Sequence, residues 1–360
     1  MTRRIYNIYV LVLSVLFAVS SLLVIPQQAK AISLPNPTPV FRFYKLADGS
    51  HFFTNNESEK NVVSQRPDIY RYEGVAFYEY TSQVANSVPV YRFYNFKQGV
   101  HFYTASQSEY QNVLTTGSWT YRYEGVAYYT LTAVSNGLAP VHRFYKFRQG
   151  VHFYTNNQAE ATYLNNTAYS TYRYEGVAYY SPDHLSFSGS GTQTTESFVL
   201  PTALTKFTMD YSGTSNFIVW LKEANTGDDY SLVANEIGAT SFSAPVGVDE
   251  NRYILEVQSS GPWTINLEFP KASSGIVTSF SGTGSSASPL FTIPSGAHTL
   301  SYSHNDSSAF IVYLWDGAGN LVDVPVIESG VTSGSVLISS DGGDYMMGIE
   351  TYGNWAISIL

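Results

Sequence analysis

Apolar and polar residues alternate in short stretches along much of the chain, and a helical period is rare. In residues 217–221, FIVWL, the side chains of Phe217, Val219 and Leu221 would share one face of a strand. Gly, Ser, Asn and Asp residues, which favour turns, separate such stretches at regular intervals. The pattern predicts a mainly β protein of antiparallel strands with short helices.

One aromatic sequence unit occurs three times in the first half of the chain. PVFRFYKLADGSHFFT begins at Pro39, PVYRFYNFKQGVHFYT at Pro89 and PVHRFYKFRQGVHFYT at Pro140, so the starts lie 50 and then 51 residues apart. Each copy closes with YRYEGVAFY or YRYEGVAYY. The copies occupy residues 39–82, 89–133 and 140–184, and together they define a predicted domain over residues 39–184.

Each copy has the pattern strand, strand, helix, strand. A Gly-containing turn joins the first two strands, and Ser106 with Glu109 has the spacing of a capping box at the start of a short helix. Gly125 in the last strand indicates a bulge or a close backbone approach. One such unit cannot bury its aromatic face alone. We therefore expect the three to close around a pseudo-threefold axis, with an open stack as the alternative.

A second, twofold repeat fills the rest of the chain. FSGSG, FVLP, FIVWL, YILEV and WTINL return as FSGTG, FTIP, FIVYL, YMMGI and WAISI after 93, 93, 93, 92 and 92 residues. Short alternating strands with polar turns predict two tandem antiparallel β-sandwiches, over residues 185–271 and 272–360. Each copy has the length of a domain with about seven or eight strands.

The N-terminus has the three parts of a secretory signal. Arg3 and Arg4 precede an apolar run over residues 8–25, and Ala29-Lys30-Ala31 follows. This predicts a signal peptide over residues 1–31, cleavage after Ala31, a Pro-rich linker over residues 32–38 and a secreted protein without a later membrane span. The apolar run is long enough to span a bilayer, so an uncleaved anchor is the alternative.

Composition narrows the possible partners. Only 13% of the residues are charged, the net charge is −9 and the sequence pI is near 5.2, which argues against nucleic-acid binding. Residues 39–184 hold 12 Lys and Arg against 11 Asp and Glu, whereas residues 185–360 hold 4 against 17. The absence of cysteine excludes disulfides and thiol chemistry.

The three copies repeat a polar and aromatic set that is the candidate ligand site. It comprises His51, His101 and His152; Arg71, Arg122 and Arg173; Glu73, Glu124 and Glu175; and Tyr44, Tyr94 and Tyr145. Tyrosine rings beside Arg and Glu suit the apolar faces and hydroxyls of sugars. The alternative is structural: an Arg and a Glu two residues apart share a strand face and can pair, and each histidine can tie its hairpin to the next repeat.

Other chemistry is less well marked. Three histidines near an axis could form a zinc set, and the acidic turns with Asp316, Asp341 and Asp344 could hold calcium, although ordinary turn chemistry explains them too. Glu59, Glu109 and Glu160, three residues after a cap, read as helix-capping groups. No HExxH, GxSxG or P-loop pattern occurs. We therefore expect no cofactor, with calcium as the exception.

The motifs PVYRFYNF, GVHFYT and YRYEGVAYY give the three copies a resemblance to known proteins. They resemble a family of uncharacterised aromatic triple-repeat modules of bacterial secreted proteins, often appended to lysozyme-type and other cell-wall hydrolases. The FTIP, FIVYL and WAISI segments resemble, more loosely, C-terminal accessory domains of secreted bacterial peptidases. The first resemblance implies an extracellular role at the cell wall, and it carries over no catalytic residue.

The sequence thus favours a secreted, non-catalytic protein that binds cell-wall or other extracellular glycan through the triple repeat. Identical copies suit repeated binding better than catalysis, because a glycosidase needs two carboxylates in different roles. A peptidoglycan or glycan hydrolase with its site in residues 39–184 is one alternative. A structural surface protein that binds another protein is the other. The oligomeric state stays open.

Overall fold

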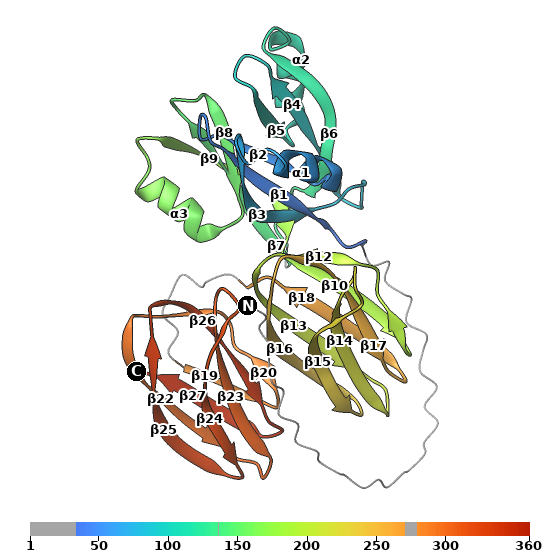
Figure 1. The fold of residues 1–360 in the computed structure, drawn as a ribbon, viewed down its shortest axis with the longest axis vertical. Helices are drawn as coiled ribbons and strands as arrows, with labels where there is room; N and C mark the ends of the chain where they lie inside the picture. Colours follow the sequence, from blue (N-terminus) through green and yellow to red (C-terminus); the bar gives the residue numbers. More distant parts are fainter. Residues whose placement is uncertain (1–33, 136, 271–278) are drawn as a thin grey trace. The chain divides into compact units, whose positions relative to one another are not determined.

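The computed structural model describes residues 34–135, 137–270 and 279–360. The expected signal peptide, its cleavage site after Ala31 and the boundary between residues 271 and 272 lie outside these ranges. The chain is mainly β with three short helices among its described residues, as the alternation predicts (Figure 1).

Each repeat contributes three antiparallel strands, with one helix between the second and the third. The strands of the first repeat form a sheet of their own, whereas the pair Leu131 and Tyr180 joins those of the second and third repeats into one six-stranded sheet. The elements of the first repeat are β1 (Thr38–Lys45), β2 (His51–Thr54), α1 (Glu57–Ser64) and β3 (Tyr70–Glu79). Those of the second are β4 (Ser87–Asn95), β5 (Val100–Thr104), α2 (Gln107–Thr116) and β6 (Tyr121–Leu131), and those of the third are β7 (Leu138–Lys146), β8 (Val151–Thr155), α3 (Gln158–Asn166) and β9 (Tyr172–Pro182). In every repeat the first strand lies in the middle.

The three repeats close around a central axis, which two layers of aromatic rings fill. In the first layer every pair among Phe53, Tyr103 and Tyr154 is in edge-to-face contact, with ring centroids 5.9–6.0 Å apart. Phe77, Tyr128 and Tyr179 form the second layer at 6.1–6.3 Å. Since each ring touches both others of its layer, the arrangement is a closed ring of repeats and not an open stack.

Hydrogen bonds from the axial tyrosines join neighbouring repeats. The Tyr103 hydroxyl donates to the Phe53 carbonyl at 2.6 Å, and the Tyr154 hydroxyl donates to the Tyr103 carbonyl at 2.6 Å. The first repeat has a phenylalanine at this position, so its ring offers no hydroxyl to the third repeat. Two of the three contacts between neighbouring repeats therefore contain this hydrogen bond.

A bulge in the last strand of each repeat confirms the prediction made from its glycine. Phe43 pairs with Tyr72 and Arg42 pairs with Gly74, which leaves Glu73 as an extra residue. Gly74 has a φ of 94°, in the region that glycine adopts without strain. The same register shift recurs at Gly125 and Gly176, whose φ values are 109° and 104°.

The two sandwiches share one topology, with every strand of the first matched by a strand of the second. The first contains β10 (His184–Ser190), β11 (Gln193–Thr194), β12 (Phe198–Leu200), β13 (Ala203–Tyr211), β14 (Asn216–Glu223), β15 (Asp229–Ile237), β16 (Thr240–Val248), β17 (Asn251–Gln258) and β18 (Pro262–Glu268). The second contains β19 (Ser279–Thr283), β20 (Ser286–Ala287), β21 (Phe291–Ile293), β22 (Gly296–His304), β23 (Ala309–Asp316), β24 (Leu321–Ser329), β25 (Thr332–Ser340), β26 (Gly343–Glu350) and β27 (Asn354–Ile359).

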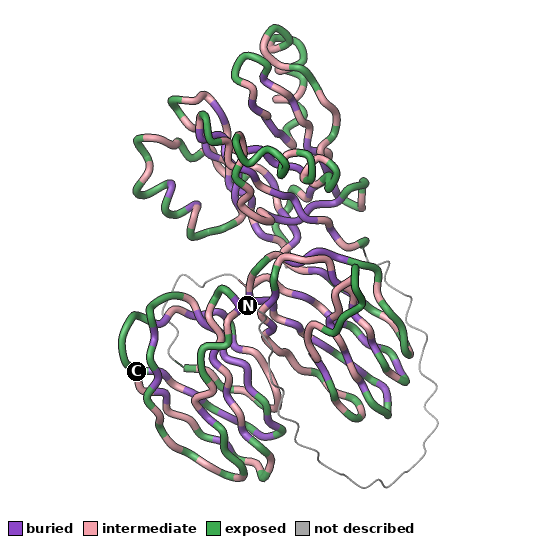
Figure 2. Tube along the Cα trace, viewed as in Figure 1, coloured by how far each residue is buried: buried purple, intermediate pink, exposed green. Residues whose placement is uncertain are grey.

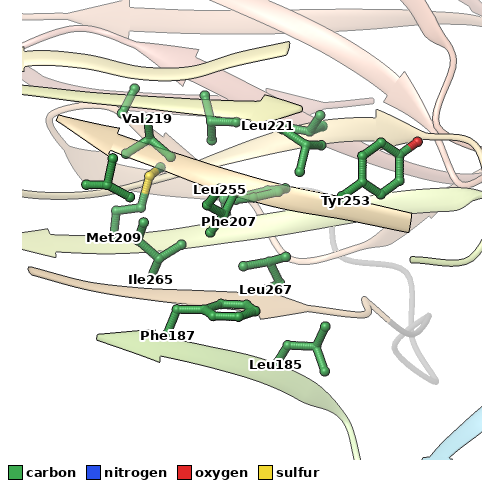
Figure 3. Packing of buried hydrophobic residues seen from close by; sticks show 14 of the residues in the cluster. Leu185, Phe187, Phe207, Met209, Val219, Leu221, Tyr253, Leu255, Ile265 and Leu267 are labelled. Atoms are coloured by element: carbon green, nitrogen blue, oxygen red, sulfur yellow. The ribbon is translucent and has the colours of Figure 1, made fainter. Parts of the chain in front are cut away.

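One sheet of the first sandwich has the order β10-β18-β13-β16 and the other β11-β17-β14-β15, and the second sandwich repeats both orders. Buried and exposed residues alternate along these strands (Figure 2). The inward side chains of the first sandwich, including Phe207, Leu221 and Ile265, are fully buried and fill the space between its two sheets (Figure 3). Each sandwich has nine described strands against the seven or eight expected, because two short strands, such as β11 and β12, pair with one long strand.

None of the helices in the described ranges combines the length and apolar character that crossing a membrane requires.

Candidate functional site

The predicted site residues of each repeat lie in one row across its three strands. In the first repeat Tyr44 on β1 pairs with His51 on β2 and with Arg71 on β3. Such cross-strand neighbours have their side chains on the same face. The Arg71 guanidinium lies 4.8 Å from the centre of the Tyr44 ring. The centres of the His51 and Tyr44 rings are 5.4 Å apart. Tyr94 and Tyr145 have the same neighbours in the other repeats.

The bulge directs the glutamate of each repeat into this row. The Glu73 carboxylate lies 3.0 Å from Arg42 Nε and 3.3 Å from His51 Nε2, and it accepts a hydrogen bond from Arg71 at 2.9 Å. Glu124 and Glu175 make the same three contacts in their repeats at 2.7–3.2 Å. Only 15–16% of these three glutamate side chains is exposed. The carboxylate therefore links the three strands of its own repeat.

In each repeat the glutamate of the bulge forms a cluster with the histidine and the two arginines that contact it. A second glutamate, from the helix of a neighbouring repeat, completes each cluster. Arg42 donates to Glu160 of the third repeat at 3.0 Å. Arg92 likewise donates to Glu59 of the first repeat, and Arg143 to Glu109 of the second, both at 2.8 Å. These three bonds run once around the ring, so they connect every repeat to the next.

These helix glutamates correct the capping interpretation. Asn56 caps α1 as predicted, since its side chain accepts a bond from the Glu59 backbone N–H. The Glu59 carboxylate does not return to the cap, because the Thr54 hydroxyl already accepts the Asn56 backbone N–H. It accepts instead from Thr54 and from Arg92 of the next repeat. Ser106 with Glu109 and Asn157 with Glu160 repeat the backbone cap.

The histidines act as contacts between repeats. His51 packs on Phe153 of the third repeat at 4.6 Å; the corresponding pairs are His101 with Phe52 and His152 with Phe102, both at 4.9 Å. Burial and the charge of Arg92 lower the pKa of His101 to about 4, against the opposing charge of Glu124. Burial and Arg143 do the same for His152. Both imidazoles are therefore neutral near pH 7.

The carboxylate of the first repeat is correspondingly held in its ionised form. Burial raises the pKa of Glu73, but the contacts with His51 and Arg71 and the charge of Arg42 outweigh it and lower the pKa to about 2. The cluster thus pairs its carboxylates with guanidiniums. Through the bond from Arg42 to Glu160 it also holds the first repeat to the third.

The described part of the chain shows no set of ligands for either the zinc or the calcium hypothesis. Across residues 34–135, 137–270 and 279–360, no three His, Asp or Glu side chains are grouped as metal ligands. The Asp316 carboxylate accepts two bonds from Asn320, and Asp344 accepts one from Thr292. These are turn and cross-strand bonds.

The outer part of each row is open to solvent. The side chains of Arg71, Arg122 and Arg173 are 63%, 69% and 60% exposed, although each is bonded to a glutamate and lies over a tyrosine ring. Two residues beyond each tyrosine, Leu46, Phe96 and Phe147 are 48%, 49% and 47% exposed. The Phe147 ring contacts the Tyr145 ring edge-on at 6.1 Å. Sequence reasoning missed these three side chains, although their shared place in the repeat was visible.

The three β-hairpin turns, residues 46–50, 96–99 and 147–150, meet at this same end of the ring. We call this end, with its three turns, the lysines Lys45 and Lys146 and the Tyr, Arg and Glu of each row, the hairpin end. Lys45 donates to the Gly99 carbonyl at 3.1 Å, and Lys146 donates to the Gly49 carbonyl at 2.9 Å. Gln98 donates to the Gln149 carbonyl at 2.7 Å and completes the circle. The exposed Arg and apolar side chains of all three repeats are thereby held around one surface.

Near the ends of the third strands, the axis carries three polar side chains that the sequence did not reveal. Glu79, Thr130 and Ser181 occupy equivalent positions and are fully buried. Thr130 donates to the Glu79 carboxyl at 3.2 Å, and Ser181 donates to the Tyr78 carbonyl at 2.8 Å. Burial raises the pKa of Glu79 well above its ordinary value, and the Thr130 bond opposes this only in part. Burial thus favours the protonated form of Glu79 inside the ring.

The raised pKa of Glu79 predicts a pH dependence of stability. A carboxyl with a raised pKa in the folded state stabilises the fold fully at low pH, and this contribution is lost as pH rises above about 4.3, the unfolded value. The loss amounts to about 1.4 kcal/mol per pH unit until the folded pKa is reached. We expect Glu79→Gln to remove this slope and to stabilise the protein at pH 7, measured by denaturant unfolding between pH 4.5 and 8.

The comparison must use the difference between the variant and the wild type at each pH. His101 and His152 have lowered pKa values, so their contribution falls as pH decreases and has the opposite sign. Their effect cancels in the difference, because neither histidine is changed. Parallel stability curves for wild type and Glu79→Gln would show that Glu79 titrates normally.

A protein-family model matches part of the chain. The model of a family described as a domain of unknown function (DUF5648) matches residues 26–131 and, in an overlapping second segment, residues 120–192. The matched residues include all three repeats, and the chain is similar to this family over that part. The comparison with curated proteins found no match to this chain.

Proposed function

We propose that the chain is a secreted, non-catalytic binding protein that recognises cell-wall or other extracellular glycan through its triple repeat. The observation that carries the proposal is the exposed arginine that each repeat presents over a half-buried tyrosine ring. A glutamate and a tyrosine ring hold each guanidinium in place, so little conformational freedom remains to be lost on binding. The same unit occurs three times around one surface, which suits a polymer with repeating groups.

The chemistry of the pair fits a sugar. An arginine has five N–H donors, and Arg71 uses one of them on Glu73 while its side chain remains mostly exposed. The other donors can meet hydroxyl or carboxylate oxygens, while the neighbouring apolar side chains Leu46, Phe96 and Phe147 can cover C–H faces of the ring. Binding at the hairpin end would leave the buried His and Glu as supports.

The buried arrangement also supports the non-catalytic part of the proposal. A glycosidase needs one carboxyl group that keeps its proton near neutral pH and a second that is ionised. In each cluster both carboxylates contact arginine, and every cluster has the same composition. The alternative hydrolase would have to use a group outside these clusters.

The test is a pull-down of residues 32–360 on purified bacterial cell walls, with and without soluble sugars as competitors. We expect wall binding that soluble glycan competes away, and a loss of at least tenfold for Arg71→Ala/Arg122→Ala/Arg173→Ala because three linked sites are removed. Binding that sugars do not compete, but protease treatment of the walls abolishes, would favour a protein partner. Release of soluble fragments from labelled walls would instead identify a hydrolase.

A further inference from the structure

We infer that the ligand of the hairpin end is an anionic polymer, a chain bearing regularly spaced carboxylate or phosphate oxygens; this inference rests on the proposed function and narrows its substrate class. It comes from the charge around the three turns. The cations of this surface are Lys45, Arg71, Lys97, Arg122, Lys146, Arg148 and Arg173, and its carboxylates are Asp48, Glu73, Glu124 and Glu175. This gives seven positive against four negative groups in a chain whose net charge is −9.

The position of the charges strengthens the inference. The glutamates are about 15% exposed, whereas their arginine partners are at least 60% exposed. Each cluster is therefore polar, with its negative end inside the ring and its positive end at the surface. A polymer approaching from solvent meets guanidinium first, and electrostatic attraction favours negative groups on it.

Geometry favours anionic oxygens over neutral hydroxyls at each guanidinium. A planar guanidinium donates two parallel bonds to a carboxylate or phosphate, and such charge-assisted bonds are about twice as strong as neutral ones. The tyrosine beneath Arg122 and the bond to Glu124 fix the plane of the guanidinium and leave its outer edge toward solvent. A neutral sugar would offer these guanidiniums only uncharged acceptors, which form the weaker bonds.

The cations are also spread so that one chain can contact several of them. The backbone carbonyls of Gly49, Gly99 and Gln149 bind side chains of neighbouring turns, and this fixes the spacing of the three turns. Lys97 lies over the Trp119 ring at 3.5 Å, which places a further cation and an exposed ring beside the second turn. The arrangement predicts multivalent, salt-dependent binding.

The experiment compares three soluble polymers of similar length against the mature chain: polygalacturonate, poly(ribitol phosphate) and uncharged dextran. We expect at least tenfold tighter binding of one or both anionic chains than of dextran, and at least a tenfold loss between 50 and 500 mM salt. Binding of polygalacturonate alone assigns carboxylate as the recognised group, and binding of poly(ribitol phosphate) alone assigns phosphate.

Matched variants locate the effect. Arg122→Gln/Arg173→Gln removes two charges from the hairpin end, and Lys206→Gln/Lys222→Gln removes two charges from the first sandwich. We expect at least a tenfold loss for the first variant and less than twofold for the second, with unchanged near-UV circular dichroism. Arg122→Lys/Arg173→Lys keeps the charge but loses the planar donor pair, so we expect an intermediate loss.

The outcomes separate the inference from the proposed function. Dextran binding equal to that of both anionic polymers, or equal losses in the two charge-removal variants, overturns the inference and leaves glycan recognition intact. If the protein binds neither the polymers nor purified cell walls, the proposed function itself is wrong.

Discussion

Deletion of residues 132–182, which contain all three strands and the helix of the third repeat, is expected to unfold the first two repeats while the sandwiches keep their own transition. The deletion removes one ring from each axial layer and exposes Phe53, Phe77, Tyr103 and Tyr128, which are at most 1% exposed in the intact ring. Exposure of a large buried side chain costs about 2–3 kcal/mol, so these four rings alone approach the stability of a typical domain. Near-UV circular dichroism and limited proteolysis would follow the loss.

The control replaces the connection between the first two repeats, residues 81–86, with a Gly/Ser segment of equal length. This variant keeps all three repeats, so the ring should melt almost as the wild type does. A two-repeat protein that melts cooperatively near the wild-type temperature would show that the repeats do not depend on closure.

Replacement of a bulge glutamate is expected to act mainly on stability. Glu124→Gln removes the negative charge between Arg92, Arg122 and His101 while it keeps the shape of the side chain. Loss of largely buried, charge-assisted contacts costs about 2 kcal/mol, or roughly 6 °C in melting temperature for a domain of this size. The triple variant that also replaces Glu73 and Glu175 should lose about three times as much if the sites are independent.

The matched control is Glu196→Gln, an exposed residue of the first sandwich that carries the same change of charge. It should leave the melting temperature within about 1 °C, as surface substitutions usually do. Cell-wall binding measured on the same folded variants gives the second readout. Unchanged stability combined with lost binding for Glu124→Gln would mean that the carboxylate contacts the ligand directly. Fragment release by the wild type, abolished in Glu124→Gln alone, would reveal a hydrolase.

Local features of each repeat could be predicted from the sequence because short-range chemistry determines them. The hairpins follow from alternating residues around a Gly turn, and the helix starts follow from Asn56, Ser106 and Asn157. The bulge follows from a glycine inside an aromatic strand, and the pairing of Arg122 with Glu124 follows from their spacing. None of these depends on where the other repeats lie.

Contacts between repeats could not be assigned, because three nearly identical copies do not indicate which copy contacts which. The sequence gives Glu160 and Arg42 no reason to pair across the ring in preference to partners in their own repeats. The burial of Glu79 could not be predicted either. A single glutamate between tyrosines, followed by polar residues, has the sequence pattern of an ordinary surface residue. Only closure of the ring buries it beside Thr130.

The phenylalanine at position 53 gives the ring one seam that differs from the other two. The first and third repeats are not consecutive in the chain, and their joint is the one that lacks the axial tyrosine hydroxyl bond. At the opposite end of the axis, Ser181 still ties these repeats together through the Tyr78 backbone. We therefore expect local opening of the ring to begin between β2 and β8, while the Ser181 bonds keep the two repeats connected at the other end of the axis. Backbone amides at this contact should exchange with deuterium before those at the other two contacts between repeats.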